Sequence, residues 1–519
     1  MRIRKLLRVR FVVYSFTEQE KIMAELTPMM QKYMETKEQY KDCILFYRLG
    51  DFYEMFFDDA IVASKELAIA LTGKSCGLEE RAPMCGIPYH AVETYLARLV
   101  SRGYKVAICE QVEDPKLAKG LVKREVIRVV TPGTNLDVQS LEASKNNYLM
   151  CIAYTSDGIG ISAADVTTGD YYVTEVEDLR KLKDELMKYE PSEIICNEAF
   201  LVSGYDVEDL KSRLHMSVSS LESHMFDDDG CRRILMRHFK VNTLIGLGVE
   251  EFPTGILAAG ALLQYLYDTQ KTDLEHFTHI SPYLTSKYML LDSSTRRNLE
   301  LTETLREKQK RGSLLWVLDK TKTAMGGRLL RNYIEQPLID KEEMEKRLDA
   351  IQELNQDSIS RDEIREYLNP VYDLERLLSK VTYKTANPRD LIAFRNSLQM
   401  LPPIKTVLAG FQKEELAAIR EEIDGLEDIY QLIDEAIVEE PPISIREGGM
   451  IKDQFDETID HLRAAKHDGK QWLVQLEEED RERTGIKNLK IKKNNVFGYF
   501  FEVTNSYKDL VPEDYIRKQ

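Results

Sequence analysis

The segment Gly50–Phe56 carries the side chains best suited to recognising another molecule, because it places an aromatic ring next to a carboxylate. Phe52 and Glu54 are two positions apart, so on an extended strand they project from the same face. An aromatic ring can stack on a nucleic-acid base, worth roughly 1–3 kcal/mol, and as a minor-groove wedge it can kink DNA by roughly 20–90°. Phosphate repels a carboxylate, so Glu54 would be useful only where it meets a base donor. The alternative interpretation is a buried aromatic strand with an exposed glutamate.

Lysines near residue 490 form a second group that could contact nucleic acid. Residues 489–503 alternate with a period of two around the turn-prone pair Asn494-Asn495, which predicts a β-hairpin with lysines on one face. These candidates for phosphate contact are Lys490, Lys492 and Lys493. Local clustering matters because the net charge of the chain is −17, so its overall field does not attract nucleic acid. The basic stretch 116–128 is a weaker candidate, and a solvated strand face is the alternative for the lysines.

A nucleotide site is not expected in this chain. Gly73-Lys74-Ser75 resembles the end of a P-loop, but that motif needs a glycine five positions earlier, where Ala68 stands. A polar turn after a helix is the better interpretation. Since no other Gly-Lys-Ser/Thr occurs, we expect no cofactor and no catalytic residue here.

Metal chemistry is also not expected. The seven cysteines are scattered without a CxxC pair, which is typical of core residues in a reducing cytoplasm rather than of a zinc site. Asp165 and Asp170 could be metal ligands of a nuclease. Two-metal nucleases need several convergent carboxylates around ions roughly 3.5–4 Å apart, and no further Asp or Glu stands nearby at a suitable spacing.

The elements that must position these residues divide the chain into several domains, as its length of 519 residues requires. Residues 23–133 and 134–272 each alternate strands with helices, which predicts two small α/β domains. In the first we expect strands at 43–47, 52–56 and 104–109, a helix capped by Asp58 or Asp59, and a helix at 91–102. In the second we expect strands at 148–153, 158–165 and 170–176 and helices at 177–189 and 228–239.

The character of the sequence changes after residue 272. Residues 273–462 are dominated by long amphipathic helices, typical of an extended scaffold. The expected helices are 296–309, 341–354, 374–380, 414–439 and 453–482. Residues 463–519 end in β structure, and residues 1–22 are expected to be a non-native or disordered extension. No apolar run approaches the roughly 20 residues of a membrane span.

Several segments together resemble the MutS mismatch-recognition family, in the order of that family's domains from Met23 to Gln519. The segment Cys43–Asp59 closely resembles its Phe-x-Glu region. Further similar segments are Pro83–Ala91, Ala107–Gln111, Arg128–Thr134, Asp165–Gly169, Asp292–Asn298, Met325–Arg328, Asn387–Leu391, Ile445–Gly449, Arg481–Gly485 and Phe497–Tyr499. The resemblance implies a mismatch-recognition domain (23–133), a ribonuclease-H-like connector (134–272), a helical core and lever (273–462) and a truncated clamp (463–519).

The resemblance also implies a function. Phe52 would stack on a mispaired or unpaired base, Glu54 would accept a hydrogen bond from it, and a mismatched step would be chosen because it bends more cheaply. Lys490, Lys492 and Lys493 of the clamp would grip phosphates. The full-length family uses ATP and Mg²⁺, forms homodimers and acts with the downstream repair protein MutL in the cytoplasm, at the nucleoid. Its ATPase domain has no counterpart in this sequence, so we expect no ATPase activity of this chain.

Two other classes of protein stay open at this point. One is a decayed or architectural DNA-binding fragment without repair activity, and the other is a nuclease that uses the carboxylates of the second α/β domain. A helical scaffold that binds only proteins is disfavoured by the domain that contains Phe52 and Glu54.

Overall fold

The computed structural model describes residues 26–113, 120–137, 141–212, 216–494, 498–512 and 514–516 of the chain. They divide into two compact units. The first comprises two stretches of the chain, the residues up to Ala386 and Ala393–Leu426. The second comprises Asn387–Ile392 and the residues from Glu427 onward. Within the described ranges, no helix combines the length and the apolar composition needed to cross a bilayer.

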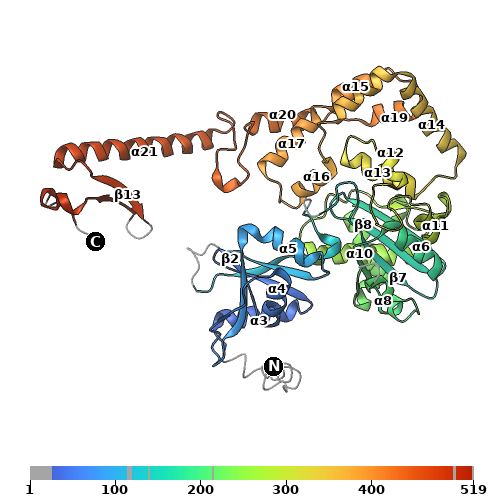
Figure 1. Ribbon diagram of the computed structural model, residues 1–519, viewed down its shortest axis with the longest axis horizontal. Coiled ribbons are helices and arrows are strands. Elements are labelled where there is room, and N and C mark those ends of the chain that lie inside the picture. Colours follow the sequence, from blue (N-terminus) through green and yellow to red (C-terminus); the bar gives the residue numbers. More distant parts are fainter. Residues whose placement is uncertain are drawn as a thin grey trace. The chain divides into compact units, whose positions relative to one another are not determined.

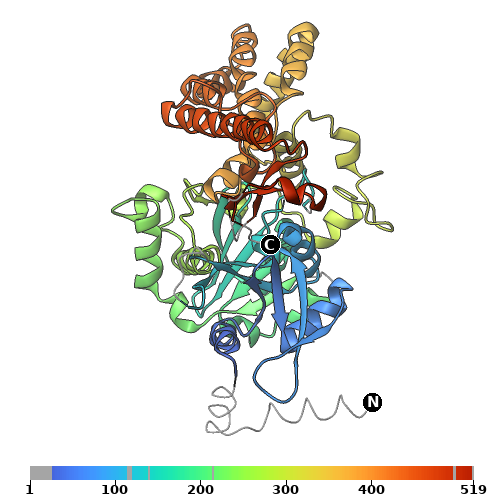
Figure 2. The same ribbon diagram turned by 90° about the vertical axis from the view of Figure 1, so that its left-hand side faces the viewer.

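The first unit begins with a six-stranded sheet in the order β3-β4-β2-β1-β5-β6 (Figures 1 and 2). Its strands are β1 (Cys43–Leu49), β2 (Phe52–Phe56), β3 (Thr72–Lys74), β4 (Ala82–Pro88), β5 (Lys105–Gln111) and β6 (Arg124–Val130). The helices are α3 (Pro28–Gln39), α4 (Phe57–Leu67) and α5 (Val92–Val100). Strand β1 is antiparallel to β2 and parallel to β5, so this is the mixed α/β domain that the sequence predicts.

The two faces of this sheet bury different side chains because residues alternate along each strand. Ile44 and Phe46 pack in the same core cluster as residues of α4 and α5. Leu45 and Tyr47 pack in a second cluster with Met30 and Tyr33 of α3. The sheet is therefore covered on both sides, by α3 on one and by α4 and α5 on the other.

The predicted cap of α4 is wrong. The helix begins at Phe57, directly after β2, and its N-cap position makes no side-chain hydrogen bond. Asp59 instead turns into the core, where its Oδ2 accepts from the Leu45 amide at 2.9 Å and its Oδ1 accepts from Lys37 Nζ at 2.9 Å. This carboxylate ties α3, β1 and α4 together, a long-range role that helix periodicity cannot reveal.

The second sheet has six strands in the order β11-β10-β7-β8-β9-β12. Its strands are β7 (Leu149–Tyr154), β8 (Ile159–Asp165), β9 (Asp170–Val176), β10 (Glu193–Cys196), β11 (Ser217–Ser220) and β12 (Ser281–Pro282). Its helices are α6 (Leu179–Tyr189), α7 (Glu198–Leu201), α8 (Val207–Ser212), α9 (Asp228–His238) and α10 (Pro253–Gln270). Helix α10 approaches β8 so closely that a Cβ at Gly160 would lie 1.9 Å from the Thr254 carbonyl oxygen.

The seven cysteines are all free and buried, which confirms their interpretation as core residues.

Glu193, fully buried at the start of β10, holds the segment that joins the two sheets. It accepts hydrogen bonds from the Thr131 hydroxyl, the Gly133 amide at 3.1 Å and the Tyr265 hydroxyl at 2.8 Å. A buried carboxylate is tolerated when several donors satisfy it, as here.

Helices follow the second sheet as predicted, but with different breaks. In the first unit they are α11 (Ser293–Asn298), α12 (Leu314–Leu318), α13 (Ala324–Glu335), α14 (Lys341–Gln356), α15 (Ser358–Leu368), α16 (Leu374–Thr382), α18 (Leu401–Leu408) and α19 (Glu414–Glu422). The predicted helix 296–309 is wrong: α11 ends at Asn298, and Glu300 and Lys308 have left-handed backbones with φ of 47° and 48°. The predicted helix 414–439 is interrupted after α19, where Leu426 has a φ of 46°.

An ion-pair network fastens the helices to the second sheet domain. Arg328 of α13 is 3% exposed and donates to both carboxylate oxygens of Asp373, each at 2.7 Å. It also donates to Glu375 at 2.6 Å and to the Ala143 carbonyl at 2.9 Å. Since a buried guanidinium is costly unless it is paired, this network fixes α13 against α16 and against the segment that precedes β7.

The second unit contains α20 (Glu427–Ala436) and the long helix α21 (Glu457–Thr484), while α17 (Pro388–Leu398) runs from it into the first unit. Figure 1 shows α21 as one continuous helix. It is followed by the antiparallel strands β13 (Lys490–Asn494) and β14 (Gly498–Glu502), which confirms the predicted hairpin. Asn494 pairs with Gly498 rather than forming the turn, and residues 495–497 lie outside the described residues.

We expect one histidine to make the stability of the first unit depend on pH. Burial lowers the pKa of His276 to about 4, and its ring packs 5.1 Å from that of Tyr383. Its pKa in the unfolded chain is near 6.5, so as the pH falls below that value the unfolded state gains the proton first and stability is lost. Between pH 7 and pH 5 the loss should be about 2 kcal/mol.

The measurement is urea unfolding at both pH values for the parent chain and for His276→Phe. The variant should lose about 2 kcal/mol less than the parent on acidification, whatever its stability at pH 7. Equal losses in the two proteins would contradict the assignment.

Candidate nucleic-acid interface

Phe52 and Glu54 lie on the same face of β2, as their spacing predicts. Tyr53 and Met55 point to the opposite face and are buried in the core formed with α4 and α5. Phe56, on the face of Phe52 and Glu54, is covered by α3, with its ring 4.9 Å from that of Tyr33. Phe52 is at the opposite end of β2 from Phe56, beyond the part of the strand that α3 covers, and it is 47% exposed. Most of β2 is therefore part of the core, whereas its first residue, Phe52, is exposed at the surface.

The local backbone explains why Phe52 stands clear. Gly50 has a φ of +61°, a left-handed conformation that favours glycine, and it forms the turn between β1 and β2. On the other side, Gly86 of β4 is the cross-strand partner of Glu54. A Cβ at Gly86 would lie 3.6 Å from Glu54 Cγ and 3.8 Å from Phe52 Cδ1. The glycine thus leaves both side chains room above β4.

A network on the opposite face holds the turn that carries Phe52. The Tyr53 hydroxyl donates to Glu110 Oε1, and Arg48 donates to the same oxygen at 3.1 Å. The Arg48 guanidinium also stacks 3.8 Å from the centre of the Tyr89 ring. Burial, with the hydrogen bond to Glu110, raises the pKa of Tyr53, so the phenol stays a donor at neutral pH. Sequence reasoning missed this support because Glu110 is far along the chain on β5.

Glu54 has a partner that the sequence did not reveal. Lys74 Nζ lies 2.5 Å from Glu54 Oε2. The predicted polar turn at Gly73-Lys74-Ser75 is wrong, since Thr72–Lys74 forms the edge strand β3. A P-loop lies between a strand and the start of a helix. Here the segment is itself part of a strand, and the next element is another strand, β4. The short run is too small for a periodicity signal, so only the pairing with β4 discloses it.

The lysines of the hairpin do not share one face, so that expectation is wrong. Lys490 and Lys492 point to one side of β13 and Lys493 to the other, because strand residues alternate. Lys492 pairs with Glu502 at 2.7 Å, and Lys493 lies 5.3 Å from the Tyr499 ring. All three are exposed and extend from a two-stranded ribbon. Such a ribbon could reach phosphates from either side.

The other basic stretch offers less free charge. Lys123 pairs with Glu125 at 2.6 Å, and Arg124 donates to the Arg48 carbonyl at 2.7 Å. Residues 114–119 lie outside the described residues. The positive charge of the described part of this stretch is thus largely engaged within the domain.

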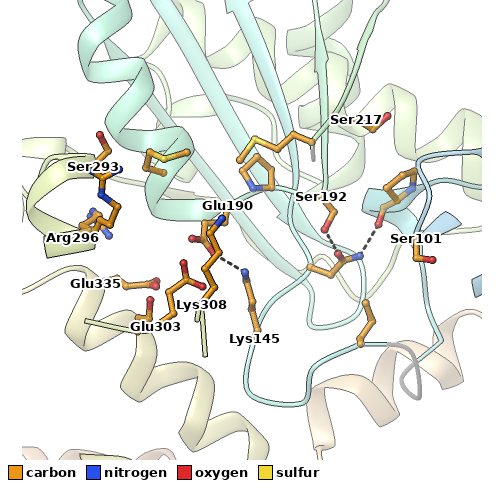
Figure 3. A pocket seen from close by; sticks show the side chains of 18 of the residues that line it. Ser101, Lys145, Glu190, Ser192, Ser217, Ser293, Arg296, Glu303, Lys308 and Glu335 are labelled. Carbon is orange, nitrogen blue, oxygen red and sulfur yellow. Dashed lines mark hydrogen bonds and ion pairs between the residues drawn. The ribbon is translucent and has the colours of Figure 1, made fainter. Parts of the chain in front are cut away.

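Two sizeable cavities are lined by neither Phe52 nor Glu54. One of about 860 Å³ lies among α5, α6, α11 and the segment 301–308. Figure 3 shows that acids and bases face each other across it, with Lys145 and Glu190 joined by an ion pair of 2.5 Å. Burial raises the pKa of Glu335 to about 7 at this site. Because positive and negative side chains line it together, the cavity lacks the one-signed surface that attracts a nucleic acid.

Asp165 and Asp170, the two possible metal ligands of a nuclease, both accept hydrogen bonds from neighbouring residues of the domain. Asp165 is fully buried and accepts from the Asn147 amide at 2.9 Å and from the Thr167 hydroxyl at 2.7 Å. Asp170 accepts from Asn146 at 2.9 Å and from the Thr168 hydroxyl at 2.8 Å. Among the described residues, no group of three His, Cys, Asp or Glu side chains could hold a metal ion. Both carboxylates are thus engaged by donors of the domain itself.

Comparison with known proteins gives a consistent result along the chain. Residues 27–139 match the model of MutS domain I, residues 147–280 that of MutS domain II, and residues 294–510 that of MutS domain III. The DNA mismatch repair protein MutS of Lachnoclostridium phytofermentans is 65% identical over 497 residues, covering 96% of this chain and 53% of the relative. The protein of the same name from Ruminiclostridium cellulolyticum is 54% identical over 500 residues, covering 96% of this chain and 57% of the relative.

A third relative of that name, from Acetivibrio thermocellus, is 53% identical over 502 residues, with 96% of this chain and 57% of the relative covered. The chain spans about half the length of the curated relatives it matches. The resemblance carried by the motifs is confirmed, and it now rests on sequence identity along almost the whole chain. The chain belongs to the MutS family and carries its domains I, II and III.

Proposed function

We propose that this chain recognises mispaired or unpaired bases in duplex DNA and so initiates mismatch repair. The observation that carries the proposal is the exposed ring of Phe52, 47% accessible at the start of a strand whose other apolar side chains are buried. Phe52 belongs to neither of the two core clusters of this domain. Its ring next to the Glu54 carboxylate fits a surface that stacks on one base and hydrogen-bonds to it. The family membership and the names of the relatives support the same substrate.

In the mechanism that we propose, Phe52 enters the minor groove and stacks on the mispaired base. A mismatched step unstacks and bends more cheaply than a paired one, so the selection is largely indirect. Glu54 accepts a hydrogen bond from the displaced base. The rigid sheet beneath, with Tyr53 and Met55 in its core, keeps the two side chains in register with each other.

The other parts of the chain take supporting roles in the proposal. We assign residues 23–133 to mismatch recognition, 134–272 to the connector, 273–462 to the core and lever, and 463–519 to the clamp. Lys490, Lys492 and Lys493 contact phosphates. These domains bind DNA without breaking bonds, whereas ATP and Mg²⁺ belong to a different domain of the full-length family. A homodimer, a MutL partner and a cytoplasmic location at the nucleoid complete the proposal.

The substitution Phe52→Ala should abolish the preference for a G·T or single-base-loop duplex over a matched duplex, while weak binding to both persists. The stacking that the substitution removes is worth roughly 1–3 kcal/mol, and only the mismatched complex contains it. Fluorescence anisotropy with short labelled duplexes measures both dissociation constants. Tyr372→Ala is the matched control, since Tyr372 is also an exposed aromatic, 53% accessible, outside this domain. A preference that survives Phe52→Ala would show that the wedge is elsewhere.

The substitution Glu54→Gln should strengthen binding to matched DNA and reduce the preference for the mismatch. Removing the charge relieves phosphate repulsion in both complexes, but it replaces a charged acceptor, whose hydrogen bond is worth about 1.5–3 kcal/mol, by a neutral one. The same titration measures both effects. Glu38→Gln, on the exposed side of α3, is the control and should change neither value. Weaker binding of Glu54→Gln to matched DNA would contradict the expectation.

Replacing Lys490 and Lys493 together by Ala should weaken binding to matched and mismatched DNA by the same factor. Phosphate contacts carry no sequence information. Each lysine–phosphate pair removed should reduce the slope of log K against log salt by about 0.9, so the double variant should reduce it by about 1.8. Salt titrations of both duplexes check this, with Lys341→Ala on α14 as the control. A change confined to the mismatched duplex would exclude a pure phosphate role.

A further inference from the structure

We propose that Lys74 is the counter-ion that positions Glu54 for a mispaired base, holding one carboxylate oxygen while the other accepts from the base. This inference rests on the proposed function of Glu54. It concerns a residue outside the Phe-x-Glu segment, on an edge strand two places away in the sheet, and it assigns Lys74 a share in the discrimination between mismatched and matched DNA.

The geometry of the pair shows that the lysine makes a directed contact. Thr72 of β3 and Phe56 of β2 both pair with Met84 of β4, so these three residues form one row across the sheet. Lys74 lies on one side of that row and Glu54 on the other. The lysine side chain bridges the row, with its Nζ 5.6 Å from the centre of the Phe56 ring and 2.5 Å from Glu54 Oε2.

The surroundings make this pair stronger than an ordinary surface ion pair. The Glu54 side chain is 16% exposed and that of Lys74 is 34% exposed, so solvent and salt screen the pair only in part. The Phe56 ring beneath attracts the ammonium group and limits its freedom. Glu54 is therefore held in one position before any DNA arrives, which lowers the cost of ordering it on binding.

The carboxylate keeps one free position. Within the described part of the chain, the hydrogen bonds and ion pairs of Glu54 all go through Oε2 to Lys74. Oε1 is thus available to a donor on a base stacked on Phe52. The ammonium group also offsets the phosphate field that would otherwise drive a carboxylate away from the groove.

The role of Lys74 should appear in the ratio of affinities for mismatched and matched DNA. In the mismatched complex Glu54 is enclosed against the base, and an unpaired carboxylate is costly there. In the matched complex no base covers Glu54, so its exposed part keeps its contact with water. Lys74→Met should therefore lower the ratio roughly tenfold, the size of one charge-assisted hydrogen bond, whereas Lys74→Arg, which keeps the cation, should preserve most of it.

A double-mutant cycle with Glu54→Gln separates this role from a phosphate contact. We measure both dissociation constants for the 519-residue parent, Lys74→Met, Glu54→Gln and the double variant, after circular dichroism has shown that each is folded. In the Glu54→Gln background there is no charge to offset, so Lys74→Met should leave the ratio unchanged. Lys32→Met is the control, because Lys32 also pairs with a glutamate of this domain, Glu35, at 2.7 Å.

Two results overturn the proposal in distinguishable ways. If Lys74→Met weakens both complexes by the same factor, with or without Glu54→Gln, then Lys74 is only a phosphate contact and the counter-ion role is wrong. If the parent itself shows equal affinity for the two duplexes, the proposed function fails and the role of Lys74 fails with it.

Discussion

The alternation of side chains along β2 is the constraint on which the rest of the account depends. Tyr53 and Met55 are fixed in the core with α4 and α5, and Phe56 is covered by α3. A strand cannot bury these side chains and turn its remaining ones elsewhere, so Phe52 and Glu54 must share the uncovered end of the α3 face. The core thus determines which two side chains meet a ligand and the spacing at which they do so.

Local pairing moderates the negative charge of this acidic chain around Phe52. The net charge is −17, yet two acidic side chains near Phe52 are engaged: Glu110 by Arg48 and Tyr53, and Glu54 by Lys74. Pairing of this kind weakens the field that phosphates meet close to the surface. The exposed lysines of the β13–β14 hairpin supply charge that is less fully engaged. Recognition would then depend on a few positions, while the acidic remainder of the chain limits binding to arbitrary sequences.

Structural features that depend on periodicity and on local chemistry could be predicted from the sequence. The alternating strands and helices of both α/β domains, the buried cysteines and the shared face of Phe52 and Glu54 were all predictable. Two of the failures have the same physical origin, which is pairing between distant segments. Asp59 accepts a hydrogen bond from the amide of Leu45 instead of capping α4, and Thr72–Lys74 forms an edge strand because β4 lies beside it. The helix expected at 296–309 is broken by left-handed residues that amphipathic spacing does not detect.

Photo-cross-linking can show whether the side chain of residue 52 meets the mispaired base. A benzophenone amino acid in place of Phe52 would be irradiated with a duplex that holds a single mismatch, and the cross-linked nucleotide would be mapped. We expect a cross-link at the mispaired base or its immediate neighbour, and this cross-link should move when the mismatch is moved along the duplex. Cross-links spread evenly along the DNA would contradict this expectation. So would the absence of a cross-link from position 52 when the benzophenone amino acid at position 372 does cross-link.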